Sequence, residues 1–248
     1  MYPLKKFNLF AASVVLMLTI STPFASAQEI TRNLKSFSRI IVSPRINLIL
    51  EKGEHEDIRM VYSNVSEDKI NIEVSGRTLR LYLDDAKVAE KPNPHTGKSP
   101  YHDASLTAYV TYTELDHLEI RGNQELTCKS PLLAERFTLK AYGENEISLY
   151  SLRTEYFRTS LYGENDLHVK GGKAEFQKYK LFGDNKINTQ DMKSYSATAT
   201  IYGESRILLT THDNLRVNAF GESKVSYSGD ASVNKGLIFG HTEIHKVN

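Results

Sequence analysis

Cysteine and tryptophan are nearly missing from this sequence: 248 residues include one cysteine and no tryptophan. The single Cys128 excludes an intramolecular disulfide, although an exported protein could form one. No histidine with an asparagine or aspartate can be assigned to it as catalytic partners. We therefore expect Cys128 to be a small buried apolar side chain.

An excess of one charge is also lacking. The 31 lysines and arginines nearly balance the 30 aspartates and glutamates, which leaves a formal net charge of +1. This balance indicates no general attraction to nucleic acid or to an anionic membrane. No basic stripe interleaved with aromatic residues is evident along the chain, so we predict no nucleic-acid partner.

Motifs of common enzymes and metal sites are absent from the sequence. It contains neither a Gly-x-Ser-x-Gly nucleophile elbow nor a phosphate-binding loop. The eight histidines are scattered, and His241 and His245 are only weak metal-ligand candidates by their spacing. We predict no catalytic residues, no metal ligands and no cofactor.

Long apolar runs are confined to the N-terminus. Lys5 and Lys6 precede an apolar run at residues 9–20, and residues 25–27 read Ala-Ser-Ala. This order is typical of a secretory signal peptide, which we assign to residues 1–27. A membrane anchor is the alternative, but the run is shorter than the about 20 residues that a span needs. We predict export to the periplasm or outer surface of a Gram-negative bacterium, with no transmembrane segment after cleavage and, without a cysteine near the cleavage site, no lipoprotein anchor.

Alternation of apolar and polar residues dominates the first half of the mature chain. This period of two predicts half-buried strands, at residues 36–42, 46–52, 57–63, 70–76, 79–83 and 106–112. The polar stretch EKGEHED, residues 51–57, is typical of a hairpin loop between two of these strands. Residues 84–105 are rich in proline and charge, which indicates an exposed loop. No amphipathic helical stripe is present.

From residue 120 the sequence repeats. YGENEI at residues 142–147 returns as YGENDL and then as FGDNKI, each 20 residues further on. The repeated glycine recurs at intervals of 20, 20, 20, 18 and 19 residues, and a degenerate copy, RGNQEL, precedes the series. The series comprises Gly122, Gly143, Gly163, Gly183, Gly203, Gly221 and Gly240. A fixed period of this length is typical of a solenoid.

The apolar columns of the repeat define its inward face. Positions two before and four after each glycine are apolar throughout, and the position six after it is mostly apolar until Lys246 in the last copy. Residues two apart share one face of a strand, so each repeat is expected to be strand, glycine turn, strand. We predict an all-β fold, a right-handed parallel β-helix (β-solenoid) with a less regular N-terminal β portion. Residues 28–248 form one domain, irregular over 28–116 and built of seven coils over 117–248.

Three outward or corner columns surround the glycine. The aromatic column precedes it: Tyr142, Tyr162, Phe182, Tyr202, Phe220 and Phe239. The acidic column follows it: Glu144, Glu164, Asp184, Glu204 and Glu222. The third column is Asn145, Asn165, Asn185, Ser205, Ser223 and Thr242, which we interpret as a hydrogen-bonded ladder whose asparagines tolerate left-handed geometry.

Each of the first two columns has two interpretations. The aromatic column is either a stacked ladder that stabilises the coils or a flat exposed stripe that stacks on sugar rings or on a protein. The acidic column is either a solvated row of turns or a cation site. Its carboxylate spacing also fits that of retaining glycosidases, as any acidic ladder would.

The order of segments resembles the head GIN domain family, a domain of unknown function that is common in Bacteroidetes and associated with putative auto-transporter adhesins. The resemblance covers about residues 30–248 and rests on FSRIIVSPRINLILEKGEHEDIRMVYS, LRLYL, VTYTELDHLEIRGNQEL and YSGDASVNKGLIFGHTEIHK. It implies an exported, mainly parallel β-helical protein and no defined activity. The family pattern has small-Gly-Ser-Gly at the turn, where this chain has aromatic-Gly-Glu-Asn.

We therefore expect a non-enzymatic envelope or surface module that binds a glycan or an envelope protein. The candidate ligand-binding residues are those of the aromatic column up to Phe220 and of the acidic column. A polysaccharide-degrading β-helix enzyme is one alternative, supported by fold analogy alone. A structural spacer that self-assembles into oligomers is the other.

Overall fold

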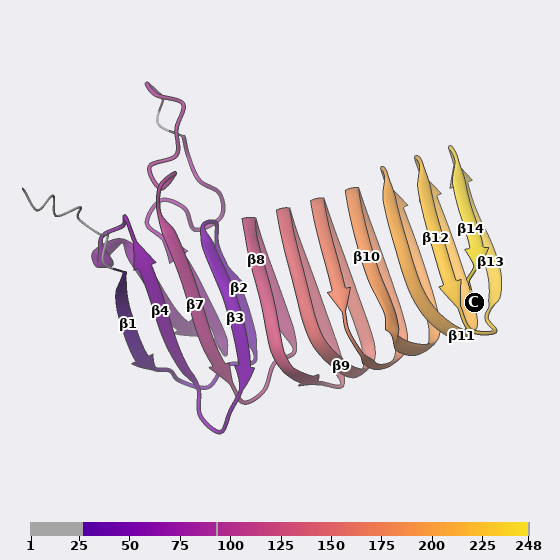
Figure 1. Cartoon of the computed structure of the whole chain (residues 1–248), viewed down its shortest axis with the longest axis horizontal. Helices are drawn as coiled ribbons and strands as arrows, with labels where there is room; N and C mark the ends of the chain where they lie inside the picture. Colours follow the sequence, from indigo (N-terminus) through magenta and orange to yellow (C-terminus); the bar gives the residue numbers. More distant parts are fainter. Residues whose placement is uncertain (1–26, 93, 248) are drawn as a thin grey trace, which may run out of the picture.

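The computed structural model describes residues 27–92 and 94–247. Except for its last residue, the predicted signal peptide therefore lies outside the described residues. The molecule is elongated, with an irregular sheet portion at the N-terminal end and a stack of coils leading to the C-terminus (Figure 1). Within the described ranges, no helix is long and apolar enough to cross a membrane.

The irregular portion matches the predicted strands closely and adds one that the sequence did not reveal, β1. Its elements are β1 (Gln28–Asn33), β2 (Arg39–Val42), β3 (Ile46–Lys52), β4 (Asp57–Ser63), the 3₁₀ turn η1 (Glu67–Lys69), β5 (Ile70–Ser75), β6 (Thr78–Leu83) and β7 (Ser105–Tyr112). Of these, β3 and β4 have the predicted bounds, and β5, β6 and β7 differ from prediction by one residue at one end. Strand β2 begins three residues later than the predicted strand at residues 36–42.

The predicted hairpin between β3 and β4 is wrong. Sheet order is β1-β4-β7-β3-β8, so β7 lies between the two strands. It pairs antiparallel with β4 and parallel with β3. The polar linker at residues 53–56 spans the intervening strand, since four extended residues reach about 13 Å. The two edges of β7 pair with β3 and β4 only after the chain returns from the loop at residues 84–104. This pairing is long-range, so the local turn residues between β3 and β4 do not predict it.

The segments β2 and β3 form an irregular first coil. Strand β2 pairs parallel with β6 on one side and with residues 117–120 on the other, and β3 pairs parallel with residues 126–128. Pro44 and Arg45 turn the corner between them, and Arg45 has φ of +75°. The solenoid therefore continues into the N-terminal portion without a glycine corner.

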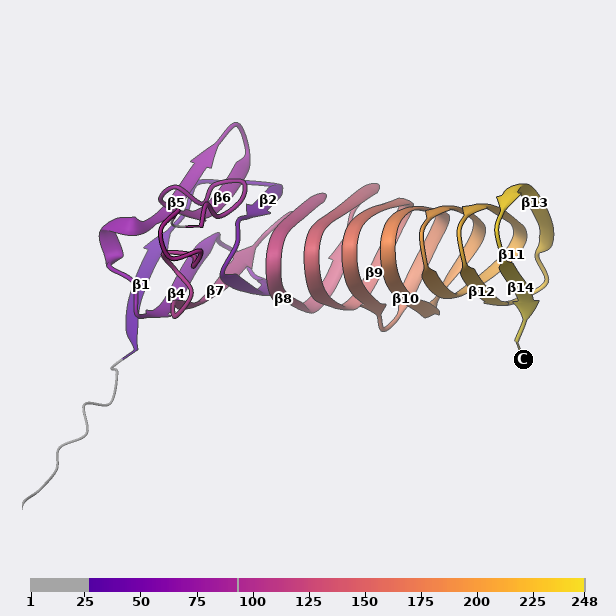
Figure 2. The ribbon, with the colours of Figure 1, turned by 90° about the horizontal axis from the view of Figure 1, so that it is seen from above.

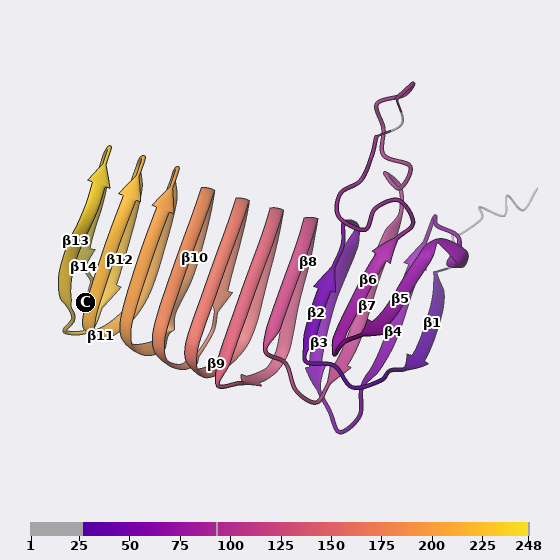
Figure 3. The ribbon, with the colours of Figure 1, turned by 180° about the vertical axis from the view of Figure 1, so that it is seen from behind.

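The regular coils confirm the predicted parallel β-solenoid, with about six turns from residue 117 onward rather than seven. Their strands are β8 (His117–Leu133), β9 (Arg136–Val169), β10 (Gly172–Tyr202), β11 (Ser205–Phe220), β12 (Ser223–Ser228), β13 (Ser232–Phe239) and β14 (Thr242–Lys246). Successive coils lie side by side along one axis (Figures 2 and 3). They pair parallel and in register, so that Gly122 lies opposite Gly143, and Gly183 opposite Gly163.

The apolar columns form the core, as expected. The columns two before and four after the glycine are at most 3% exposed through the fifth repeat, as with Ala141 and Ile147. Thr189 occupies the third column and bonds the hydroxyl of Tyr179 inside the core. Lys246, in the same column of the last coil, is exposed and pairs with Asp230 at 3.1 Å, so it places a charge at the terminal edge of the sheet. Cys128 is buried, as expected, and burial raises the pKa of its thiol.

The glycine corners have positive φ, whereas the asparagines beside them do not. Each repeat glycine has φ between +100° and +133°. Among the described residues other than glycine, positive φ occurs only at Arg45, Asn64, Arg77 and Asp85. The prediction of left-handed geometry for the asparagine column is therefore wrong. Each glycine alone makes its corner, and the asparagine side chain points into the stack.

Candidate functional site

The aromatic column is a continuous stack that reaches the surface. Its six rings have centroid separations of 4.7–5.4 Å and interplanar angles of 3–13°. Tyr202 is 42% exposed and Phe239 is 61% exposed, while the other four rings are half-buried. The rings therefore form the stacked ladder of the first interpretation and also face solvent.

Stacking determines which part of each ring a ligand can contact. Each inner ring has a neighbour on both faces, so the column presents ring edges and tyrosine hydroxyls rather than flat faces. The expectation that sugar rings stack on a flat stripe is thus wrong for the inner rings. Aromatic edges carry the positive part of the ring quadrupole, which favours electron-rich groups such as carboxylate and sulfate oxygens.

Arg121 closes the N-terminal end of the column. Its guanidinium carbon is 5.7 Å from the ring centroid of Tyr142, within reach of a cation–π contact. The Nε of Arg121 donates to Oε1 of Glu119 at 2.7 Å. Nε2 of His117 and Nζ of Lys140 approach the other carboxylate oxygen at 3.7 and 4.0 Å. Glu119 thus holds three cationic or ionisable groups at the start of the column.

Glu119 is a buried acid that lies outside the acidic column. It is 6% exposed, and its interactions with His117 and then Arg121 lower its pKa to about 2, against the opposing effect of burial. Of these two, Arg121 makes the shorter contact and dominates the geometry. A carboxylate that is ionised throughout the physiological range is a poor general acid. Its arrangement therefore suits positioning of cations rather than proton donation.

The acidic column is exposed along its length. Glu144 accepts a hydrogen bond from Asn123 at 3.0 Å, and the remaining four carboxylates lie in register on successive coils. Across residues 27–92 and 94–247, no group of three or more His, Cys, Asp or Glu side chains is arranged to hold a metal ion. The column is an exposed row beside the aromatic column, with the glycine corner between them.

The third column is the predicted ladder through Ser223, but the prediction is wrong for Thr242, whose hydroxyl has no hydrogen-bond partner among the described residues. Asn145 Nδ2 donates to Asn165 Oδ1 at 2.8 Å, and Asn165 Nδ2 donates to Asn185 Oδ1 at 3.0 Å. All three amides are buried. The hydroxyls of Ser205 and Ser223 continue the column by donating to glycine carbonyls of the previous coil. This ladder positions the corner and does not contact solvent.

A groove lies at the N-terminal end of the aromatic column. Its volume is about 730 Å³, and Tyr142, Glu144 and Arg121 form one wall. Val88 and Glu90, from the loop at residues 84–104, form the other wall. Glu90 is held by Arg45 at 2.6 Å. The sequence reveals the loop but not its position, because the Arg45–Glu90 contact joins segments 45 residues apart.

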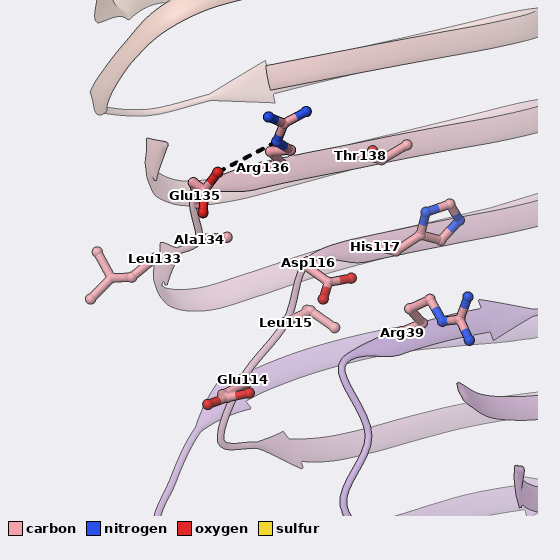
Figure 4. Close-up of a pocket in the computed structure, with 10 residues that line it drawn as sticks. All are labelled: Arg39, Glu114, Leu115, Asp116, His117, Leu133, Ala134, Glu135, Arg136 and Thr138. Carbon is pink, nitrogen blue, oxygen red and sulfur yellow. Dashed lines mark ion pairs between the residues drawn. The ribbon is translucent and has the colours of Figure 1, made fainter. Parts of the chain in front are cut away.

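A second depression of about 530 Å³ lies at the other end of the same strands (Figure 4). Arg136 and Thr138 lie on one strand, His117 on the next and Arg39 on the one beyond (Figure 4). Arg136 also lies 4.9 Å above the ring of Tyr156, which stacks on Phe176 at 5.1 Å. This second aromatic stack was missed in the sequence, since only two coils carry it and no glycine marks it.

Comparisons with known proteins agree with this architecture. No curated protein matches the chain. A putative adhesin from Bacteroides fragilis is 15% identical with a TM-score of 0.74, over 91% of this chain and 99% of that one. A putative adhesin from Parabacteroides merdae is 18% identical with a TM-score of 0.64, over 90% and 96%. A putative lipid binding protein from Parabacteroides distasonis is 17% identical with a TM-score of 0.61, over 89% and 97%.

At these identities the solved structures establish the fold alone. The assignment to a family depends instead on a match to a sequence profile. The family profile described as "Putative auto-transporter adhesin, head GIN domain" matches residues 36–231. The match spans the irregular portion from residue 36, after β1, and the coils through Gly221, which include every corner of the aromatic column except the last. The chain therefore belongs to the putative auto-transporter adhesin, head GIN domain family.

Proposed function

We propose that the protein is an exported, non-enzymatic module of the bacterial cell envelope or surface that binds carbohydrate or protein. Its binding surface comprises the aromatic column and the outward residues beside it. The observation that carries this proposal is the continuous stack of six partly exposed rings on successive coils. Export is supported by the adhesin description of the family and by the signal-like residues 1–27.

The arrangement favours binding along the coil axis. Successive coils repeat the same side chains at about 4.8 Å, so a repeating ligand meets equivalent groups at each step. Many weak contacts of this kind give avidity when they are linked on one rigid surface. A polymer with a regular repeat fits this geometry better than a single small molecule.

The proposal is tested on a glycan array and in pull-downs from envelope extracts. A variant with Tyr142, Tyr162 and Tyr202 changed to Ala should lose binding, while Tyr195→Ala should retain it. Tyr195 is a matched control because it is exposed and contacts no other ring in the described structure. If the folded triple variant keeps every interaction of the wild type, the aromatic column is not the binding surface.

A further inference from the structure

The strands that end in the aromatic column carry an uneven distribution of charge. Their outward side chains alternate with buried ones over residues 136–142, 156–162, 176–182, 196–202 and 214–220. We call these outward positions the cationic face. Its charged members are Arg136, Lys140, Arg158, Lys178, Lys180 and Arg216, and none of its outward positions is an aspartate or glutamate.

The rest of the cationic face is aromatic or hydrogen-bonding. Its aromatic members lie at its two edges: Tyr156 and Phe176 at one edge, and the aromatic column through Phe220 at the other. Between and below them are hydroxyl and amide side chains: Thr138, Ser160, Ser196, Thr198, Thr200, Asn214 and Asn218. The face thus offers cations and neutral hydrogen-bonding groups between two rows of ring edges.

The glycine corner separates this face from one of opposite charge. Beyond the corner, the outward positions of residues 144–148, 164–168, 184–188, 204–208 and 222–226 hold seven carboxylates and three cations. The carboxylates are the acidic column together with Glu146 and Asp166, and the cations are Lys186, Arg206 and Lys224. A net charge of +1 for the whole chain therefore conceals two adjacent faces of opposite sign.

The cations at the centre of the cationic face lack counter-ions in the part of the chain that the structure describes. Among the described residues, no carboxylate forms an ion pair with Arg158, Lys178, Lys180 or Arg216, although Lys140 lies 4.0 Å from Glu119 and Arg136 lies 3.5 Å from Glu135. Arg158 and Lys178 lie directly opposite each other on paired strands. Like charges in that position destabilise a sheet, so this placement opposes folding and favours an external anion.

We propose that the cationic face binds an acidic polysaccharide, one that bears carboxylate or sulfate groups along its length. This inference rests on the proposed function and specifies the ligand of the same surface. Lysine and arginine bind the acidic groups, ring edges face them with positive charge, and hydroxyl and amide side chains bond sugar hydroxyls. The face measures about 20 Å by about 20 Å, enough for several sugar units.

Other anionic partners fit less well. Single-stranded nucleic acid binds mainly by stacking bases on free aromatic faces, and here neighbouring rings cover the inner faces. A protein interface has a core depleted in lysine and buries about 800 Å² per partner, whereas this face has two central lysines and about 400 Å². An acidic polysaccharide requires neither free ring faces nor an apolar core.

The test compares binding of the mature chain to polygalacturonate, dextran sulfate, neutral dextran, single-stranded DNA and phosphatidylserine vesicles. The decisive variant is Arg158→Gln/Lys178→Gln/Lys180→Gln. Its matched control is Lys186→Gln/Arg206→Gln/Lys224→Gln, which removes the same charge from the adjacent face of neighbouring coils. Circular dichroism confirms that both variants are folded.

We expect the wild type to bind at least one acidic polysaccharide in preference to neutral dextran, DNA and vesicles, and more weakly as salt rises from about 50 to about 300 mM. The decisive variant should lose about tenfold or more in affinity, and the control less than about twofold. Equal losses in the two variants, or a preference for DNA or vesicles, overturn the proposal. Binding of neutral glycans alone overturns the acidic-polysaccharide proposal and leaves the proposed function intact. The proposed function is tested separately, on the glycan array and in the envelope pull-downs.

Discussion

A Cβ atom on Gly163 would lie 2.3 Å from the carbonyl oxygen of Gly143 in the previous coil. The same approach recurs at the next corner, where a Cβ on Gly183 would lie 2.4 Å from the Gly163 carbonyl. Glycine is required here for two reasons: its φ of +106° is rarely adopted by other residues, and the neighbouring backbone occupies the space. The glycine therefore recurs about every 20 residues because the backbones of successive coils touch at each corner.

Gly163→Ala should destabilise the protein by about 3 kcal/mol or more, since strain and overpacking add. Gly97→Ala is the matched control, because Gly97 also has positive φ, +67°, but a Cβ there meets no atom within 4 Å. The control should cost about 1 kcal/mol. Denaturant unfolding measures both values, and equal losses would show that φ alone, rather than contact between coils, selects glycine.

The buried amide ladder should be sensitive to the loss of one rung. Asn165 accepts from Asn145 and donates to Asn185, so Asn165→Leu leaves the buried Oδ1 of Asn185 without a partner. It also removes one of the two hydrogen bonds that Asn145 Nδ2 donates, the other being to the Tyr142 carbonyl. We expect it to cost about 2–4 kcal/mol. Asn165→Ser should cost less, because Ser205 and Ser223 occupy the same place in later coils and donate to glycine carbonyls. If the leucine variant is the more stable of the two in denaturant unfolding, the ladder contributes less than packing does.

Regular coils could be predicted from the sequence because each repeat contacts only its neighbours. Once Ala141 and Ile147 face the core, alternation places Tyr142 and Glu144 outside. The stack then extends the same placement to every coil. Ring stacking in the aromatic column follows from the same register. That neighbouring rings cover the faces of the inner rings becomes evident only from the structure.

Other features depended on contacts that no local pattern encodes. The insertion of β7 between β3 and β4 joins segments separated by the loop at residues 84–104. The cationic face has no signature in the linear sequence, because Arg158, Lys178 and Arg216 lie about 20 residues or more apart and acidic residues such as Glu155 and Glu175 lie near them in the sequence. Positive and negative charges nearly cancel along the sequence, whereas the stacked coils place them on two separate faces.

The aromatic column should stabilise the coils independently of any ligand. Phe182 stacks on Tyr162 at 4.7 Å and on Tyr202 at 5.0 Å, so Phe182→Ala removes two ring contacts and should cost about 1–3 kcal/mol. Tyr195→Ala removes an exposed ring without a ring partner and should cost less than about 0.5 kcal/mol. Thermal unfolding without ligand distinguishes them. Equal melting temperatures would indicate that the column serves binding alone.

The Glu119 cluster should make stability depend on acid. The pKa of Glu119 is lowered from 4.5 to about 2 in the folded chain, so its contribution is present above about pH 4.5 and is lost as pH falls toward about 2. After allowance for solvent screening, we expect this contribution to be on the order of 1–2 kcal/mol. Glu119→Gln should therefore reduce the free energy of unfolding at about pH 7, and the wild type and the variant should converge in stability near about pH 2.

The matched control for Glu119 is Glu144→Gln. It removes an exposed carboxylate whose partner is the neutral Asn123, so it should change stability by less than about 0.5 kcal/mol at either pH. Urea unfolding across the acid range gives all three curves. A constant gap between the wild type and Glu119→Gln down to about pH 2 would contradict the prediction, because the loss would then come from packing rather than from the charge that holds Arg121 against Tyr142.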